Sequence, residues 1–160
     1  MSKVDKEELL SKEDVILRDV AGILKAMDTI VEYETYHVVR DGKELFSFRV
    51  RGLTDEEAEE CRQEATKTVR DKRLGNLAVP QEFNAAKFNS LMIVQATHPE
   101  DRAMIWDNKE LWEKANVLAG WQLVDKVLKR GEKDEVIELI ERLSGYNSEE
   151  NESRVETLKN

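Results

Sequence analysis

The sequence predicts an α+β fold, namely a mainly helical single domain with one antiparallel β-hairpin in its N-terminal half. Asp41-Gly42 separates two stretches rich in β-branched and aromatic residues, and this dipeptide suits a type I′ turn, whose two central residues both need positive φ. Four or five other stretches repeat apolar residues at helical spacing. We therefore expect a hairpin over Tyr36–Val50 that packs beside a helical body.

The 160 residues divide into three expected parts. Residues 1–33 form an N-terminal segment that is partly helical and mobile at its ends. Residues 34–146 hold the hairpin and the helical core, and residues 147–160 form an acidic, flexible tail with few apolar side chains. The helix of the first part is indicated by one apolar face, made of Ile16, Val20, Ile23, Leu24 and Met27.

The second strand of the hairpin has the clearest β pattern in the chain. Phe46, Phe48 and Val50 alternate with Ser47 and Arg49, which is typical of a strand with one buried face. The apolar members of this strand should therefore face the helical body.

A helix should begin at Thr54, directly after the hairpin. Thr54 and Glu57 form a capping box, in which each side chain accepts a hydrogen bond from the other residue's backbone N–H. Acidic residues come early and basic residues late, up to Arg73, as the helix dipole favours. We expect one helix over most of this stretch, followed by a loop from Gly75 to Gln81.

The most apolar helix should lie at the centre of the fold. It should begin after the N-cap Asn84 and end at His98-Pro99, because the residue before a proline avoids the α region. We expect Phe88, Leu91 and Met92 to form the main core together with the Ile137–Leu143 face. Leu91→Ala should then destabilise the protein by about 2–5 kcal/mol.

Three further helices follow in the C-terminal half. Asn108 should cap the first, which begins at Lys109. The second should run through Leu123–Leu128 to Gly131 as its C′ glycine, and the third should cover Val136–Leu143 and end at Gly145.

The amino-acid composition argues against several classes of function. The net charge of -9, from 25 basic and 34 acidic residues, disfavours nucleic-acid binding, in which phosphate contacts dominate the affinity. There is no run of 18 apolar residues, so we expect no membrane-spanning segment. The first residues lack the apolar stretch of a signal peptide, and a single cysteine cannot form an internal disulfide. Both features favour a cytoplasmic protein.

Catalytic and metal-binding patterns are absent from the sequence. His37 and His98 are far apart in the chain, and neither has a second ligand at metal-binding spacing. Cys61 lies among small helical residues, where a packed thiol is the simpler interpretation. Phosphate-binding loops and nucleophile elbows are also missing. We therefore expect no enzyme activity, no cofactor and no metal.

Trp106, Trp112 and Trp121 are the candidate partner-binding residues. The favoured interpretation is that they fill a small core, because tryptophan is usually buried. The alternative is an exposed aromatic groove that receives a helix of a partner protein.

Six stretches, taken in their order along the chain, carry a resemblance to a known family. They are Phe46–Thr54, Thr54–Arg62, Phe88–Glu100, Asp107–Lys114, Leu128–Tyr146 and Leu158–Asn160. In this order they resemble the tail assembly chaperone family of contractile-tailed phages and of defective Gram-positive prophages. The resemblance covers roughly residues 34–160. The sequence departs from the family pattern between Lys114 and Leu128, where NVLAGWQLVD replaces the usual Gly-Val turn and Thr-Pro helix start.

The resemblance implies a non-enzymatic assembly factor in the host bacterial cytoplasm. Such proteins bind the long, helical tape-measure protein and keep it soluble while the tail tube assembles around it. A programmed −1 frameshift often adds a longer product, which implies the tail tube protein as a second partner. Homo-oligomerisation stays open.

Three other classes of function remain as alternatives. The first is a structural tail component, and the next is an acidic DNA-mimic inhibitor. The DNA mimic is disfavoured because acids and bases interleave along the helix, as Glu59 does with Arg62 and Glu64 with Lys67. A hydrolase is the weakest alternative because no nucleophile and base are paired.

The last three residues, Leu158-Lys159-Asn160, bear on the frameshift. Their codons are compatible with a slippery A-AAA-AAC or A-AAA-AAT heptamer. An ordinary stop after a charged tail is an equally good reading. The gene sequence decides between them, because an AAG lysine codon removes the heptamer.

Overall fold

The computed structural model describes residues 20–28 and 30–146, within two compact units that cover residues 1–31 and 32–160. In the first unit residues 20–27 are helical. The apolar face predicted there is solvent-exposed at Val20, Ile23, Leu24 and Met27. The predictions for Ile16, the acidic tail and Leu158–Asn160 lie outside the described residues.

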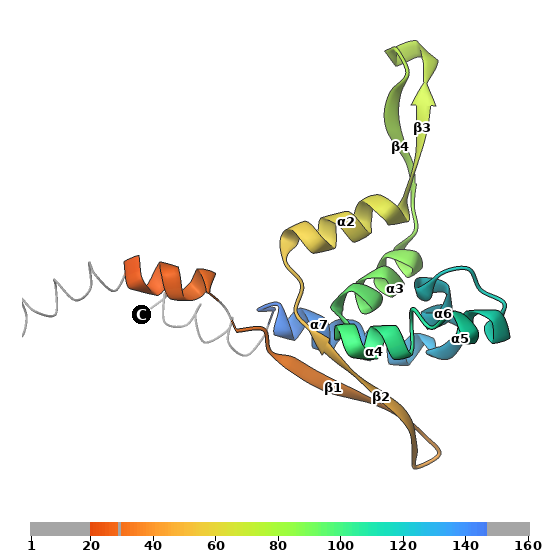
Figure 1. Ribbon diagram of the computed structural model, residues 1–160. Helices are drawn as coiled ribbons and strands as arrows, with labels where there is room; N and C mark the ends of the chain where they lie inside the picture. The colour runs from red at the N-terminus through yellow and green to blue at the C-terminus, as the bar shows by residue number, and fades with distance from the viewer. Residues whose placement is uncertain (1–19, 29, 147–160) are drawn as a thin grey trace, which may run out of the picture. The chain divides into compact units, whose positions relative to one another are not determined.

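The second unit begins with the predicted hairpin. Strand β1 (Tyr33–Arg40) pairs antiparallel with β2 (Lys43–Arg51), with Tyr36 opposite Phe48. Both turn residues have positive φ, 54° at Asp41 and 74° at Gly42, as a type I′ turn requires. The hairpin prediction is confirmed. The α+β, mainly helical class is confirmed as well, as Figure 1 shows.

The next helix is shorter than the sequence pattern indicates. Helix α2 (Asp55–Ala65) starts with the predicted capping box at Thr54. It ends at Ala65, and the chain continues as strand β3 (Thr66–Asp71), a 3-10 turn η1 (Lys72–Leu74) and strand β4 (Leu77–Phe83). The prediction of a helix to Arg73 and a loop from Gly75 was therefore wrong.

Local chemistry explains this second hairpin, residues 66–83, which we call the arm. The β-branched residues Thr66, Thr68 and Val69 are restricted at χ1 and favour strands. Gly75 and Asn76, with φ of 68° and 64°, reverse the chain between the strands. Turn residues and β-branching outweigh the helix dipole pattern here.

Helix α3 (Ala85–Ala96) begins after Asn84, whose side chain accepts from the Lys87 amide, and it ends before His98, both as predicted. Its core-facing residues are different from those predicted. Ile93, Val94 and Ala96 lie in the main cluster, whereas Leu91 and Phe88 are only half-buried and stay outside it. Met92 is buried but also lies outside this cluster. Because α3 is apolar around most of its circumference, periodicity did not determine which face meets the hairpin.

The remaining helices are α4 (Pro99–Met104), α5 (Lys109–Ala115), α6 (Gly120–Val127) and α7 (Arg130–Leu143). Asn108 caps α5 and Gly145 follows α7 with a φ of 101°, both as predicted. Gly131 is not a C′ glycine, because it lies in the first turn of α7. Glu132 accepts a hydrogen bond from the Lys129 backbone N–H at 2.8 Å, which starts a new helix there.

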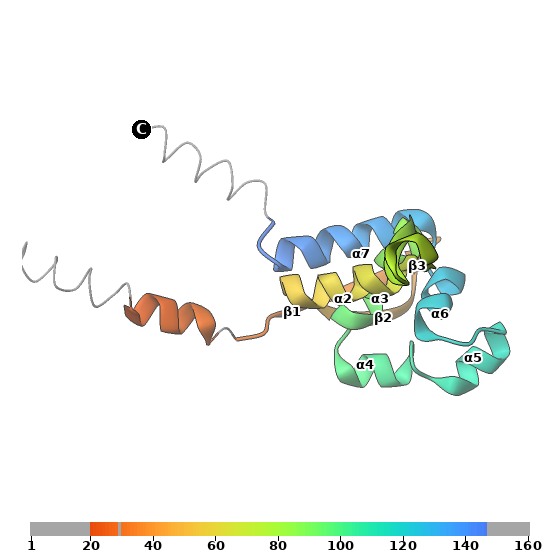
Figure 2. The ribbon, with the colours of Figure 1, turned by 90° about the horizontal axis from the view of Figure 1, so that it is seen from above.

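The core lies between the first hairpin and helices α3, α6 and α7. Figures 1 and 2 show α7 running alongside α3 and the hairpin, in agreement with the contacts between these elements. The predicted C-terminal contribution is confirmed at Ile140, and Ile137, Leu139 and Leu143 pack against the cluster. None of the helices among the described residues is both long and apolar enough for a membrane crossing. The buried cluster is Val38, Phe48, Val50, Ile93, Val94, Ala96, Trp106, Leu123, Val124, Leu128, Val136 and Ile140.

Candidate partner-binding surfaces

Neither Cys61 nor His37 is a free reactive group, because the thiol is buried and the imidazole is paired. Burial, together with the nearby carboxylates of α2, raises the pKa of the Cys61 thiol to about 11, so the thiolate nucleophile is scarce at neutral pH. His37 contacts the Glu44 carboxylate across the hairpin. Residues 20–28 and 30–146 hold no group of three or more His, Cys, Asp or Glu residues able to bind a metal ion.

A pocket of about 550 Å³ lies between the start of α3 and helices α6 and α7. Two of the charged residues that line it, Asp125 and Lys133, are paired with each other. The Asp125 carboxylate accepts from Ser90 Oγ at 2.5 Å and from Lys133 Nζ at 2.8 Å. Ser90 is fully buried, so its hydroxyl holds α3 against α6 and is not placed to attack a substrate.

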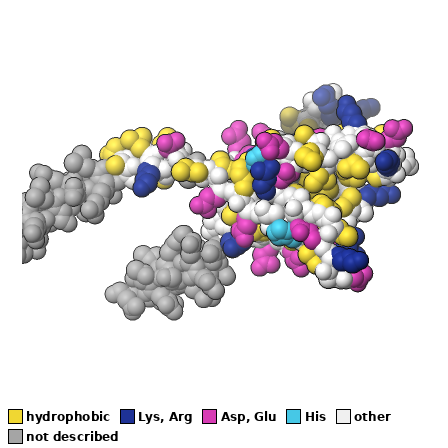
Figure 3. All heavy atoms as spheres, turned by 60° about the horizontal axis from the view of Figure 1, so that its bottom comes forward, with side chains coloured by type: hydrophobic (Ala, Val, Ile, Leu, Met, Phe, Trp, Pro, Cys, Tyr) yellow, Lys and Arg dark blue, Asp and Glu magenta, His cyan; other side chains and the backbone are white. Residues whose placement is uncertain are grey.

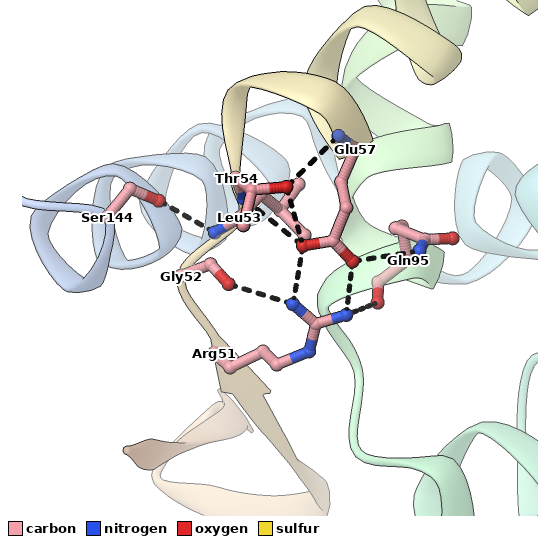
Figure 4. A network of polar contacts seen from close by, with 7 residues as sticks. All are labelled: Arg51, Gly52, Leu53, Thr54, Glu57, Gln95 and Ser144. Carbon is pink, nitrogen blue, oxygen red and sulfur yellow. Dashed lines mark hydrogen bonds and ion pairs between the residues drawn. The ribbon is translucent and has the colours of Figure 1, made fainter. Parts of the chain in front are cut away.

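The junction between the first hairpin and the helices is fixed by a polar network around Arg51 (Figure 4). The Arg51 guanidinium donates to both Glu57 carboxylate oxygens, at 2.9 and 2.6 Å, which is the bidentate geometry that makes such pairs strong. Gln95 of α3 donates to the same carboxylate at 3.1 Å. Ser144, beyond α7, accepts from the Leu53 amide at 2.9 Å. The hairpin, α2, α3 and the end of α7 thus meet at one point.

The ion pairs of this network shift the pKa values of their carboxyl groups. The hydrogen bond from Arg51 lowers the pKa of Glu57 to about 2, against the opposing effect of burial. A second ion pair fixes the same strand to α4, where Arg49 donates to Asp101 at 3.0 Å and lowers the pKa of that carboxyl group. These pairs join the second strand of the hairpin to α2 and α4.

Trp106 is a core residue in this structure. Its side chain has no exposed area, and its ring meets Phe48 edge-on with a centroid distance of 5.3 Å. The indole N–H donates to Thr97 Oγ1 at 3.0 Å, so the one polar atom of the ring is satisfied. The favoured interpretation, in which the tryptophans are buried core residues, therefore holds for Trp106.

Trp112 and Trp121 are half-buried and lie in the neighbouring helices α5 and α6. Trp112 donates from Nε1 to the Trp106 carbonyl oxygen at 2.5 Å. Trp121 stacks under the Lys87 ammonium group, which lies 4.8 Å from the ring centroid. The two rings thus have different partners, although both pack against the core cluster. Partner binding at these two residues stays a prediction.

The arm is a surface that the sequence analysis missed. All of its large apolar side chains retain exposure, 44% at Val69, 54% at Leu74 and 65% at Leu77. Beyond its own strand pairing, its closest packing is where β3 leaves α2, and the ring of Phe83 lies 5.5 Å from that of Phe88. The Thr-Lys-Thr-Val run and the Gly75-Asn76 dipeptide are the signals that could have indicated a second hairpin.

Comparison with known families now identifies the class of protein. A family model described as the phage XkdN-like tail assembly chaperone protein matches residues 21–159. The chain belongs to this family. The resemblance found in the sequence is thereby confirmed, and the match extends further towards the N-terminus than the residues that suggested it.

Other comparisons add less about this tail assembly chaperone. The crystal structure of the protein yqbn is similar at 19% sequence identity and a TM-score of 0.48, with coverage of 74% of this chain and 90% of that one. The search of curated proteins finds no match.

The outer surface of the chaperone carries mixed charges. On the face shown in Figure 3, acidic and basic side chains lie interspersed with apolar ones. Arg62 pairs with Glu59 and Lys114 lies near Glu110, within single helices. A protein that mimics DNA would need carboxylates ordered along one face, and the face in Figure 3 carries both signs of charge.

Proposed function

We propose that this chain binds the tape-measure protein of its phage or prophage and keeps it soluble while the tail tube assembles. Membership of the tail assembly chaperone family over residues 21–159 is the observation that carries the proposal. The chain acts in the host cytoplasm, by binding alone and without catalysis.

Two physical features support this role. The net charge of -9 favours solubility of a complex with an apolar client. Apolar side chains also stay exposed on the folded unit, with Trp112 and Trp121 half-buried on the body and the arm exposed beyond it. Such surfaces suit repeated weak contacts along a long helical client better than one tight site.

Co-expression with a tape-measure fragment tests the proposal. The soluble fraction of the fragment should rise in the presence of the chain and stay low beside an unrelated acidic protein expressed equally well. An unchanged soluble fraction at equal expression would contradict the proposal. Fragments should be taken from several parts of the tape-measure protein, because the contacts are expected to repeat along it.

The structural alternative has its own test. Purified mature tails should lack the chain if it acts only during assembly. Its presence there at a fixed ratio to the tube protein would support a structural tail component instead.

We propose further that a −1 frameshift near Leu158-Lys159-Asn160 yields a longer product that contacts the tail tube protein. This proposal rests on the three amino acids, which can be encoded by a slippery heptamer. The gene sequence tests it directly, because a leucine codon that does not end in A, or an early stop in the −1 frame, removes the product.

A further inference from the structure

The arm, residues 66–83, exposes an apolar row on one of its faces. Val69 lies directly opposite Val79, and Leu77 lies opposite Asp71. Side chains two positions apart on a strand share a face, so Leu77 and Val79 point to the same side as Val69. Leu74 continues the apolar surface at the tip, where it is 54% exposed.

This row is not covered by any element packed against it in the described residues. Every residue of β3 and β4 keeps some exposure, and the strands contact the body chiefly where β3 leaves α2. A two-stranded hairpin alone in water is marginally stable, and a covering element is what normally stabilises one. Its uncovered face is therefore suited to receive a partner.

The charge of the arm is opposite to that of the chain. It carries four basic and two acidic side chains, within a chain of net charge -9. The basic residues are Lys67, Arg70, Lys72 and Arg73, and within residues 20–28 and 30–146 none of them has an acidic group at ion-pair distance. Lys67 is two positions from Val69 and so lies on the same face, opposite Glu82, whereas Arg70 points to the other face. Lys72 and Arg73 precede Leu74 in the turn at the tip. Basic groups at the two ends of the apolar row are therefore available to an acidic partner.

The mode of binding follows from the strand edges. Pro80 lies in β4 and has no backbone N–H, and Lys67 and Arg70 lie on β3. Prolines and charged side chains on edge strands oppose the addition of another strand. A partner would thus bind across the apolar face rather than along an edge.

We infer that the arm is a docking site for an acidic amphipathic helix of the client, which covers Val69, Leu77 and Val79 and places its carboxylates against Lys67 at one end of the row and Lys72 and Arg73 at the tip. The inference rests on the proposed function in taking that helix to belong to the client. Charge complementarity selects the occupant, because an apolar stripe alone would fit a helix of either sign.

The preference of the arm for an acidic helix is tested first, with two synthetic helical peptides of equal length. Both carry a leucine stripe, which is flanked by glutamates in one peptide and by lysines in the other. Fluorescence anisotropy should show binding of the glutamate peptide at least about tenfold tighter than the lysine peptide. The preference should weaken as salt is added, because exposed charges are screened. Equal binding of the two peptides would overturn the inference.

Substitutions in the arm locate the site. Val69→Ser with Leu77→Ser, and separately Lys72→Glu with Arg73→Glu, should each weaken binding of the glutamate peptide by roughly fivefold to tenfold. Leu118→Ser, at an 88% exposed position between α5 and α6, and Lys109→Glu are the matched controls and should leave binding unchanged. All three tryptophans lie outside the arm, so their fluorescence reports whether the body of each variant is folded.

Co-expression separates failure of the inference from failure of the proposed function. If the parent chain does not solubilise the tape-measure fragment, the proposed function fails, and the peptide measurements still decide what the arm binds. If the parent and the Val69→Ser, Leu77→Ser variant solubilise it equally, only the inference about the arm fails. Light scattering that shows a dimer dispersed by the arm substitutions, with no peptide binding, would assign the face to a second copy and overturn the inference.

Discussion

The two hairpins of this protein have the same secondary structure and opposite surroundings. The first hairpin, β1–β2, buries Val38, Phe48 and Val50 completely or nearly so. The arm, β3–β4, buries none of its residues to that extent. One hairpin serves as a wall of the core, while the other projects from the end of α2 with its apolar side chains exposed.

The difference arises from what each sequence places on one face. The first hairpin alternates large apolar and polar residues, so one face can pack against α3 and α7. The arm places only three large apolar residues, Val69, Leu77 and Val79, on one face of its strands, and the charged Lys67 and Asp71 share that face. A strand pair therefore does not by itself specify burial, and the hairpin with the smaller apolar face is the one that stays exposed.

The largest expected effect separates the two hairpins directly. Phe48→Ala should lower the free energy of unfolding by about 3–5 kcal/mol, because it removes a buried ring that contacts Trp106. Val69→Ala in the arm should change it by no more than about 0.5 kcal/mol. Urea unfolding followed by tryptophan fluorescence measures both. Equal losses would mean that the arm is part of the cooperative core.

The helix between the hairpins should show the same contrast on its two faces. Ile93→Ala removes a fully buried side chain of the core cluster and should cost about 2–5 kcal/mol. Leu91→Ala should cost about 1 kcal/mol, since Leu91 is half-buried and outside that cluster. Thermal melting of the two variants compares them. If Leu91→Ala lost more stability than Ile93→Ala, the core face predicted from the sequence would be the correct one.

Acid should loosen the first hairpin through Glu57. The pKa of this carboxyl group is about 2 in the folded protein, compared with an ordinary value of 4.5. A lowered folded-state pKa contributes stability that is complete above the ordinary value and is lost as the pH falls towards 2. We expect a loss on the order of 2 kcal/mol over this range.

Unfolding at a series of pH values tests this contribution. Glu57→Gln should be less stable than the parent at pH 7 and should lose less stability on acidification. Glu82→Gln, which removes a carboxylate from the arm, should stay within about 0.5 kcal/mol of the parent at pH 7. Parallel pH curves for the parent and Glu57→Gln would contradict the prediction.

The turn glycines should give the smallest effects. Gly42 and Gly75 both have positive φ and free space around the position of a Cβ atom, so an alanine there is strained only by its backbone. Gly42→Ala should cost about 1 kcal/mol of global stability. Gly75→Ala should leave global stability nearly unchanged and speed hydrogen exchange at Val69 and Val79, because the arm can open locally. Exchange rates equal to those of the parent would show that the arm is not an independent unit.

Local chemistry in the sequence determined the start points and turns of most elements. The Asp41-Gly42 turn, the Thr54 and Glu57 capping box and the caps Asn84 and Asn108 all form as predicted. Each depends on residues within three or four positions along the chain. The family resemblance likewise came from the order of short stretches, and the family match confirms it.

Tertiary structure decided the features that depend on distant residues. Periodicity could not show which side of the apolar helix α3 meets the hairpin, and this choice placed Ile93 in the core and Leu91 outside the main cluster. The candidate tryptophans also differ in burial, because Trp106 is enclosed in the core beside Phe46 and Phe48, while Trp121 is half-buried under Lys87. The arm shows a further limit. Its strand residues were visible in the sequence, but its exposure follows from the absence of packed elements over residues 66–83 in the described structure, since burial is a property of what surrounds a segment.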